Sequence, residues 1–457
     1  MIPNRTRFSA NPISFFRQSD KMKNSIRKTI SALTAALAII PLFFCACDDR
    51  PTSTITIWTD KAEIASYAEL FNASHDKTKA VVVYKERLSA SLPPAKDEAA
   101  PDAIIGSLLK NSGNEKYFAN LDDMLGERDD DGEISKRKID RKFFYSSLLD
   151  YGKNEDGKQI LIPVSFNLPV IIFSDENKPL VKNAHMLELE EIRDLSKEFN
   201  ATAKSGIYTK MGFAPSWNSD FLYTAAKMTG ADFHEEGNAL AWDEKSLEIA
   251  EEFLREWTKN ANSSSTAEQD FSFKYLYTPN YKQVASGRCL FAYTTTSKFF
   301  SLAPEQTENL HFRWLTTNKT ILADDEITTA GIYRKSPARN RRDAKTFLLW
   351  MMDEENQRAM LDRSFRMNLG TKTFGICGGF SALKGVNERF FPTFYKNLLG
   401  NLPGESAIRA PAPLPTRWES LKERVVIPHL AESTRTEGWQ DAKSIDERLK
   451  SWAKQFN

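Results

Sequence analysis

The stretch QILIPVSFNLPVIIFS, residues 159–174, constrains this chain most, because two apolar runs are separated by a short break. Each run has the length of a buried strand. Pro163 and Pro169 lack the N–H that a central strand donates to its neighbour, so one continuous central strand is disfavoured. We therefore expect two short strands with a bend at Ser165–Pro169, where the chain passes from one sheet to another. The alternative is a single kinked edge strand or a hairpin.

The chain before this stretch alternates between strand and helix patterns. Strands are predicted at Thr54–Trp58, at Val81–Tyr84 and within residues 101–105. The segment after the first strand has the apolar spacing of a helix, and Asp60 with Glu63 three residues later predicts a capping box at its start. Strands joined through helices pair in parallel, so this part of the chain predicts an α/β layer.

The carboxyl ends of parallel strands meet at one edge of a sheet and form a crevice for ligands. Trp58 and Thr59 lie at one such end, and Gly106 and Ser107 at another. We therefore expect a crevice rimmed by these two strand ends.

The N-terminal region has the pattern of a secretory signal. Four basic residues between Lys21 and Lys28 precede an uncharged run from Thr29 to Cys47, which predicts a signal peptide over residues 1–46. Phe44-Cys45-Ala46-Cys47 resembles a bacterial lipobox and implies lipidation of Cys47. A membrane anchor that is retained is the alternative, and Met22 is an alternative start.

The charge balance shows no overall basic bias, so the bulk charge does not suggest a nucleic-acid partner. Lys and Arg total 62 and Asp and Glu total 61. Removing residues 1–46 takes away seven basic residues and one acidic residue, leaving 55 basic and 60 acidic, a net charge of −5. The exported form is therefore mildly acidic.

No catalytic or cofactor motif stands out in the chain. HExxH, GxSxG and GxxxxGK[ST] are absent, and the five histidines lack metal-ligand spacing, so no catalytic residue, cofactor or metal is predicted. Glu127–Lys138 resembles a calcium loop, but Lys138 stands where a bidentate Glu is required, which favours a charged surface turn. Cys289 and Cys377 are predicted to be two separate buried thiols, with a disulfide as the alternative.

The ordered set of segments resembles a known family. These segments are ITIWTD, PDAIIG, GKQILIPVSFNLPVIIFS, PSWNSDFLY, ASGRCLFAY and RRDAKTFLLWMMDEENQRAML. Over residues 54–435 they resemble the bacterial extracellular solute-binding proteins that include the maltose- and sugar-binding components of ABC importers. Residues 374–383 match no pattern of that family.

The resemblance implies an α/β, two-lobed periplasmic-binding-protein fold of type II, with the lobes joined by hinge strands and a ligand bound between them. The implied bounds are 51–164 plus 294–329 for lobe one, 171–289 plus 334–457 for lobe two, and crossings near Ser165–Pro169, Leu290–Tyr293 and Ile332–Arg334.

Candidate ligand-binding residues are the aromatic and polar side chains expected at the lobe edges. Aromatic rings suit the apolar C–H faces of sugars, and polar side chains pair with hydroxyl groups. The set is Trp58, Thr59, Ser107, Asn167, Trp217, Asn218, Tyr293 and Tyr333. For each aromatic residue the alternative is packing in the core.

The resulting hypothesis is capture of a solute rather than catalysis. The protein would be an exported, lipid-anchored, monomeric substrate-binding component that takes up a sugar or oligosaccharide and delivers it to an ABC transporter permease. Peptides, polyamines and metal ions are the other ligands of the family. Two alternatives differ in kind: a surface lipoprotein that binds a macromolecule, and an exported enzyme.

Overall fold

The computed structural model describes residues 53–127, 135, 138–237, 239–367 and 373–455. The expected signal peptide, Cys47 and most of the charged surface turn expected at residues 127–138 lie outside these residues. Within the described residues, no helix is both long and apolar enough to cross a membrane. Residues 53–457 form one compact unit.

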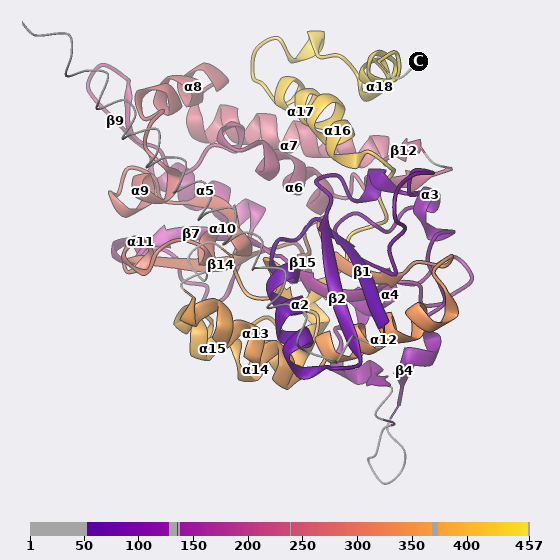
Figure 1. The fold of residues 1–457 in the computed structure, drawn as a ribbon. Coiled ribbons are helices and arrows are strands. Elements are labelled where there is room, and N and C mark those ends of the chain that lie inside the picture. The colour runs from indigo at the N-terminus through magenta and orange to yellow at the C-terminus, as the bar shows by residue number, and fades with distance from the viewer. Residues whose placement is uncertain (1–52, 128–134, 136–137, 238, 368–372, 456–457) are drawn as a thin grey trace, which may run out of the picture. The chain divides into compact units, whose positions relative to one another are not determined.

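A six-stranded sheet contains the strands predicted near the N-terminus (Figure 1). Its strands, in spatial order, are β17 (Phe380–Ser381), β6 (Ile162–Phe166), β16 (Thr328–Ile332), β3 (Ala103–Gly106), β1 (Ser53–Thr59) and β2 (Thr78–Tyr84). β1 pairs in parallel with both β2 and β3, as the strand–helix–strand pattern predicts. Helices α2 (Glu63–Ser74), α12 (Ala338–Met351) and α13 (Glu354–Arg366) belong with this sheet. We call this assembly lobe one.

A four-stranded sheet forms the second assembly, lobe two. Its order is β13 (Ala292–Thr295), β7 (Pro169–Ser174), β14 (Leu310–Thr316) and β8 (Met186–Glu188). The helices of lobe two include α5 (Leu189–Phe199), α6 (Ser219–Thr229), α7 (Glu244–Asn262), α8 (Ser265–Lys274), α9 (Asn280–Ala285), α10 (Thr296–Phe300), α11 (Pro304–Thr307), α16 (Trp418–Leu421), the π-helix η8 (Lys422–Val426), α17 (Ile427–Ser433) and α18 (Ile445–Ala453).

Shorter elements connect and border these two sheets. They are α3 (Ser112–Glu115), β4 (Leu125–Gly126), β5 (Ile139–Asp140), α4 (Ser146–Tyr151), β9 (Ala201–Thr202), β10 (Tyr208–Lys210), β11 (His234–Glu236), β12 (Ala239–Ala241), β15 (Ile321–Leu322), α14 (Lys384–Arg389), α15 (Phe391–Phe394) and β18 (Ile408–Arg409).

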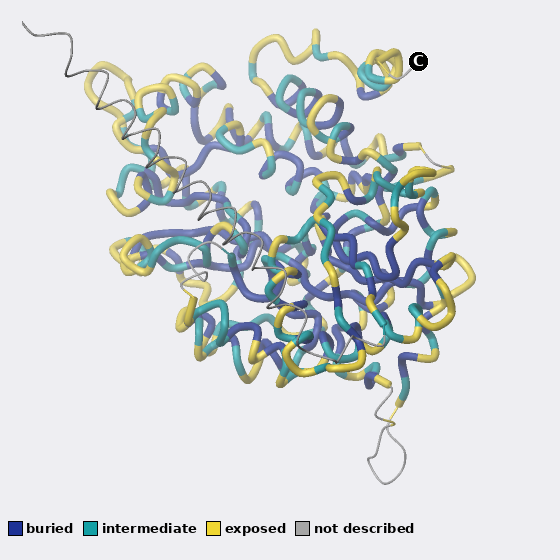
Figure 2. The backbone as a smooth tube through the Cα atoms, viewed as in Figure 1, coloured by how far each residue is buried: buried dark blue, intermediate teal, exposed yellow. Residues whose placement is uncertain are grey.

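The expected bend joins the two sheets. β6 ends at Phe166 in lobe one, and β7 begins at Pro169 in lobe two. Every residue of both strands is buried, which explains why the sequence shows two apolar runs (Figure 2). Pro163 lies where the pairing of β6 with β16 shifts register, so its missing N–H is tolerated inside the sheet.

The expected division of the chain between the lobes differs from the observed pairing. β14 lies within residues 294–329, expected in lobe one, but it pairs with β7 in lobe two. Conversely, α12 and β17 lie within residues 334–457, expected in lobe two, but they contact strands of lobe one. In the described chain no crossing occurs near Leu290–Tyr293 or Ile332–Arg334. Long-range pairing decides which sheet a strand joins, and the strand's own apolar pattern does not encode that choice.

Two later crossings run side by side. The chain returns to lobe one through residues 317–327 and enters lobe two again through residues 410–417. β15 lies in the crossing at residues 317–327, and β18 comes directly before the crossing at residues 410–417. These two strands pair in parallel, with Ile321 opposite Ile408. This ladder ties the two crossings together.

The stretch without a family match, residues 374–383, forms a tight hairpin against the bend. Cys377 and Gly378 have φ of +47° and +81°, and Ile376 pairs with Gly379 across this turn. A side chain at Gly379 would meet the backbone oxygen of Phe166 at 2.5 Å, so only glycine permits this approach. Cys377 and Cys289 are separate buried thiols, as expected.

Candidate ligand-binding site

A cavity of about 550 Å³ opens at the carboxyl ends of β1 and β3. One wall comes from lobe one, through the residues that follow β1, β2 and β3. The other comes from the segment that enters α16 and η8 and from Gln455 near the C-terminus. The lining residues are Asp60, Glu86, Arg87, Leu88, Ser89, Ala90, Ser107, Leu108, Pro415, Arg417, Trp418, Glu419, Ser420, Glu423, Arg424 and Gln455. This is the crevice that the parallel strand ends predict.

Asp60 and Ser107 form the polar floor of the cavity. The backbone N–H of Ser107 donates to Asp60 Oδ2 at 3.1 Å. Asp60 Oδ1 and Ser107 Oγ are buried and have no hydrogen-bond partner among the described residues. Buried polar atoms are nearly always satisfied in folded proteins, so these two oxygens indicate the place of a polar ligand or water.

Gly106 allows the Asp60 carboxylate to reach this position. A Cβ at Gly106 would lie 2.4 Å from Asp60 Oδ1. Burial raises the pKa of Asp60, and the Lys61 ammonium, 3.9 Å from Oδ1, opposes that shift. The carboxylate is therefore desolvated, and donors on a ligand would stabilise its charged form.

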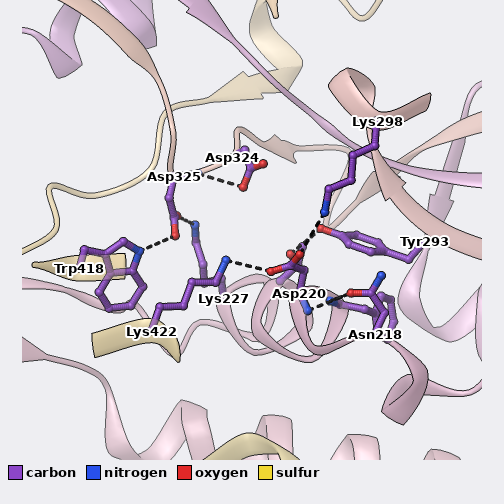
Figure 3. A network of polar contacts seen from close by, with 11 residues as sticks. Asn218, Asp220, Lys227, Tyr293, Lys298, Asp324, Asp325, Trp418 and Lys422 are labelled. Carbon is purple, nitrogen blue, oxygen red and sulfur yellow. Dashed lines mark hydrogen bonds and ion pairs between the residues drawn. The ribbon is translucent and has the colours of Figure 1, made fainter. Parts of the chain in front are cut away.

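Trp418 is the aromatic residue of this wall, and its ring also packs in the core of lobe two. Its side chain is 3% exposed, and the indole Nε1–H donates to Asp325 Oδ2 at 3.1 Å (Figure 3). Leu108 and Arg417, which line the same cavity, have φ of +55° and +67°. Two non-glycine residues in the left-handed region around one cavity are a form of backbone strain that clusters at functional sites.

Behind Trp418 lies a network of charges that joins the crossing at residues 317–327 to lobe two (Figure 3). Lys227 of α6 pairs with Asp325 Oδ1, and Lys422 of η8 lies 3.1 Å from Asp220 Oδ1. Lys298 Nζ also reaches Asp220, at 3.4 Å. Burial disfavours the Asp325 carboxylate, but Lys227 and Lys422 outweigh that effect and lower the pKa of Asp325.

Asp324 is the opposite case. It is half-buried beside Asp325, and desolvation together with that neighbouring carboxylate raises the pKa of Asp324 to about 6. Its backbone N–H donates to the carbonyl of Asn167 at 2.9 Å, so the acidic pair touches the bend between β6 and β7. The acidic pair thus connects the crossing at residues 317–327 to the bend between β6 and β7.

Direct contacts join the lobes beside the cavity. Ser112 of α3 donates through its N–H to Glu235 Oε2 at 2.7 Å and through its hydroxyl to Oε1 at 2.8 Å. Thr416 Oγ1 donates to Asn111 Oδ1 at 3.3 Å. These bonds hold the segment that follows β3 against β11 and against the crossing at residues 410–417.

Trp58, Thr59 and Tyr333, from the predicted set, lie in the protein interior rather than in the cavity. Trp58 and Tyr333 belong to the same apolar cluster and are 1% and 4% exposed. Thr59 is fully buried, and its Oγ1 accepts from the N–H of Lys61 at 3.0 Å. For these aromatic rings the alternative, core packing, is what the structure shows.

Trp217, Asn218 and Tyr293 come together at the start of α6 around a space of about 10 Å³, and Trp217 also lines a separate pocket of about 300 Å³. Asn218 caps α6 by accepting from Asp220 and Phe221, and Trp217 stacks on Phe271. These side chains are already engaged within lobe two.

Asn167 is also engaged. Its amide donates to the carbonyl of Gly378 at 2.9 Å, and its Oδ1 accepts from Thr296 Oγ1 at 2.8 Å. It joins the hairpin of lobe one to α10 of lobe two at the bend. Of the eight predicted residues, Ser107 alone lines the cavity.

Sequence reasoning missed Asp60, Arg417 and Trp418 as cavity residues. The capping-box prediction for Asp60 is wrong, because the N-cap of α2 is Ala62 and no side chain caps it. The signal that could have found Asp60 is its place directly after the strand end at Thr59, at the predicted crevice. Nothing local distinguishes Trp418 from the other tryptophans.

The described residues contain no group of three His, Cys, Asp or Glu side chains arranged to hold a metal ion.

The sequence matches no model of a known protein family and no curated protein. Solved structures do show the same fold. The cyclic α-maltosyl-1,6-maltose binding protein from Arthrobacter globiformis is 14% identical, with a TM-score of 0.56 over 88% of this chain and 97% of that chain. The GacH receptor of Streptomyces glaucescens, solved with acarbose, is 13% identical, with a TM-score of 0.54 over 89% and 98%.

An ABC substrate-binding protein from Listeria monocytogenes, in complex with cycloalternan, is 14% identical, with a TM-score of 0.54 over 89% and 98% of the two chains. These similar structures are binding proteins, and each covers nearly the whole chain. The chain therefore has the two-lobed α/β fold of the extracellular solute-binding proteins, as its sequence resemblance predicts.

Proposed function

We propose that this protein captures a carbohydrate in the cavity at the carboxyl ends of β1 and β3. The observation that carries the proposal is the pair of unpartnered oxygens, Asp60 Oδ1 and Ser107 Oγ, beside the Trp418 wall. A carboxylate accepts hydrogen bonds from sugar hydroxyls, and an indole packs on the apolar face of a sugar ring. The fold shared with sugar-binding proteins supports this ligand class.

The cavity spans the interface that closure creates. A ligand that touches both Asp60 and Trp418 gains its contacts fully only when the lobes are together. Its differential affinity for the closed form then shifts the population towards that form. An ABC transporter permease would recognise the closed, loaded protein and take up the sugar.

The N-terminal pattern supports export and anchoring. Cleavage before Cys47 and lipidation of that residue would hold a monomeric body on a bacterial membrane, in the periplasm or at the cell surface. Labelling of the cell-expressed protein with a fatty acid, lost in Cys47→Ser, tests this part independently of ligand binding.

The first test of sugar capture measures thermal unfolding of residues 48–457 against mono- and oligosaccharides, peptides and polyamines. A ligand present at one hundred times its dissociation constant adds about 2.7 kcal/mol to the free energy of unfolding. A rise in Tm with one class of sugar is expected. A rise with peptides or polyamines alone would contradict the carbohydrate assignment.

Variants then locate the site. Asp60→Asn and Ser107→Ala should each lower the affinity for the sugar that stabilises the protein about tenfold or more. The reason is that a hydrogen bond to a charged group contributes about 1.5–3 kcal/mol. Glu176→Gln, at an exposed position in the described chain outside the cavity, is the matched control and should bind normally. Undiminished affinity in the Asp60→Asn, Ser107→Ala double variant would place the sugar elsewhere.

A further inference from the structure

A dense basic cluster lies far from the cavity. Residues 334–345, RKSPARNRRDAK, contain six basic residues and one acidic residue, although the exported chain has a net charge of −5. Four of these, Arg334, Lys335, Arg339 and Arg342, are exposed. The cluster comprises the turn after β16 and the first two turns of α12.

Several of the basic side chains share one face of lobe one. Arg334, Arg341, Arg342 and Lys345 line a single surface hollow of about 980 Å³. Lys345 pairs with Asp123 at 2.6 Å, and Arg341 donates to the backbone carbonyls of Arg334 and Ser336. Within the described part of the chain, Arg334 and Arg342 form no ion pair with an acidic residue. Among the described residues, these two arginines therefore have no acidic side chain that pairs with their charge.

Asp102 fixes this face close to the start of the described chain. Its carboxylate accepts from the Thr56 N–H of β1, from the Ser336 hydroxyl and from the Asn340 amide at the start of α12. Thr56 is three residues from Ser53, where β1 begins. The basic face and Ser53 thus lie at the amino end of β1, while Asp60 and the cavity lie at its carboxyl end.

We propose that this basic face docks on the anionic surface of the bilayer to which the protein is anchored. The inference rests on the proposed lipidation of Cys47. Only five residues separate Cys47 from Ser53, so Ser53 can lie at most about 20 Å from the lipidated residue. The tether brings the amino end of β1 to the membrane, and these arginines are complementary to lipid phosphates there.

Docking in this orientation has a consequence for capture. Seven residues of strand, about 23 Å, separate the tether end of β1 from its cavity end. The bound face is at the opposite end of the sheet from the cavity, so the cavity stays open to solutes. The short tether and the basic face together give the body one preferred orientation on the membrane.

The test uses the unlipidated body, residues 48–457, so that the lipid anchor contributes nothing to binding. Residues 53–457 are a compact unit with their own cores. Sedimentation is measured with vesicles of phosphatidylcholine containing 30% phosphatidylglycerol and with pure phosphatidylcholine vesicles. Binding to the anionic vesicles alone, weakened by raising NaCl from 50 to 300 mM, is expected.

Charge variants then assign the binding to this face. Each basic residue near an anionic surface raises the partition coefficient of the protein onto vesicles about fivefold. The double variant Arg334→Gln, Arg342→Gln should therefore bind vesicles roughly 25-fold more weakly. Lys197→Gln with Lys204→Gln, both exposed on lobe two, is the control and should change it little. Thermal stabilisation by the sugar should be unchanged in both variants, which separates this test from that of sugar capture.

Three outcomes would overturn the proposal: no binding to anionic vesicles, equal loss in both double variants, or binding that pure phosphatidylcholine supports equally. The first would be expected if the acidic stretch Glu127–Glu133 of this chain, rather than a membrane, neutralises the basic face. Binding to a soluble polyphosphate with none to the vesicles would likewise reject the bilayer as the partner.

Discussion

At the residue scale, the pKa values of two neighbouring carboxyl groups in this protein are shifted in opposite directions by their surroundings. Asp325 faces Lys227 and Lys422 and accepts from Trp418, so its charge is compensated. Asp324, one residue earlier, is half-buried beside that charge, and its pKa is raised to about 6. The sequence Asp-Asp is symmetrical, and the difference comes from the elements packed around it: α6, α16 and η8.

This difference predicts the pH dependence of stability. The pKa of Asp324 is higher in the folded protein than its ordinary value of 3.8, so the folded state binds the proton more tightly. Protonated Asp324 therefore adds to the free energy of unfolding. This contribution is fully present below pH 4 and is lost as the pH rises through 6. Between pH 4.5 and pH 7.5 the titration of Asp324 should lower the free energy of unfolding by about 2 kcal/mol. Asp324→Asn cannot titrate, so this part of the decrease should be missing in the variant.

Urea unfolding at the two pH values checks this prediction. Asp97→Asn, an exposed aspartate, should retain the pH dependence of the unmodified protein. An unchanged dependence in Asp324→Asn would show that another group produces it.

At the element scale, the hairpin before β17 completes the edge of the lobe-one sheet and supports the bend. Phe380 pairs with Phe166, the last residue of β6. Asn167 donates to Gly378 in the turn of the hairpin. This element therefore stabilises the exit of the chain from lobe one, and it depends on glycine at the point of closest approach.

Gly379→Ala is expected to destabilise the protein by about 1–3 kcal/mol, because the new methyl group would overlap the backbone oxygen of Phe166. Gly404→Ala is the matched control. Gly404 has an ordinary φ of −66°, and no atom lies within 4 Å of the place that an added methyl group would take, so that change should be neutral or stabilise slightly. Equal free energies of unfolding for the two variants would contradict this account of the hairpin.

At the scale of the whole molecule, closure depends on contacts between the lobes outside the crossings. Glu235 on β11 accepts two hydrogen bonds from Ser112 on α3, next to the cavity. Figure 1 shows α3 beside the β12 strand that pairs with β11. A separation of the lobes at this point would break both bonds, so we expect them to bias the unliganded protein towards the closed form.

Glu235→Ala should shift that equilibrium towards the open form by about 1 kcal/mol, roughly fivefold, since each lost bond is partly replaced by water. Small-angle X-ray scattering of the unliganded variant should show a larger radius of gyration, and the stabilising sugar should reverse it. Glu236→Ala, the exposed neighbour, is the control. An unchanged radius of gyration in Glu235→Ala would show that these bonds do not limit opening.

The sequence by itself determined the α/β class, the first parallel strands and the bend at Ser165–Pro169. These depend on local periodicity, on the missing N–H of proline and on the length of apolar runs, all of which are readable within a few residues. It also placed the crevice at the carboxyl ends of β1 and β3, since parallel pairing follows from the strand–helix–strand order.

Only the tertiary structure decided which lobe received β14 and α12, and which polar residues remained unsatisfied. Trp58 had to be buried because the side chain faces an apolar cluster, whereas Asp60, two residues later, faces the cavity. Trp418 reaches that cavity from more than 350 residues away in sequence. Such a site is made by contacts between distant segments, and no local pattern records the partner that each segment will meet.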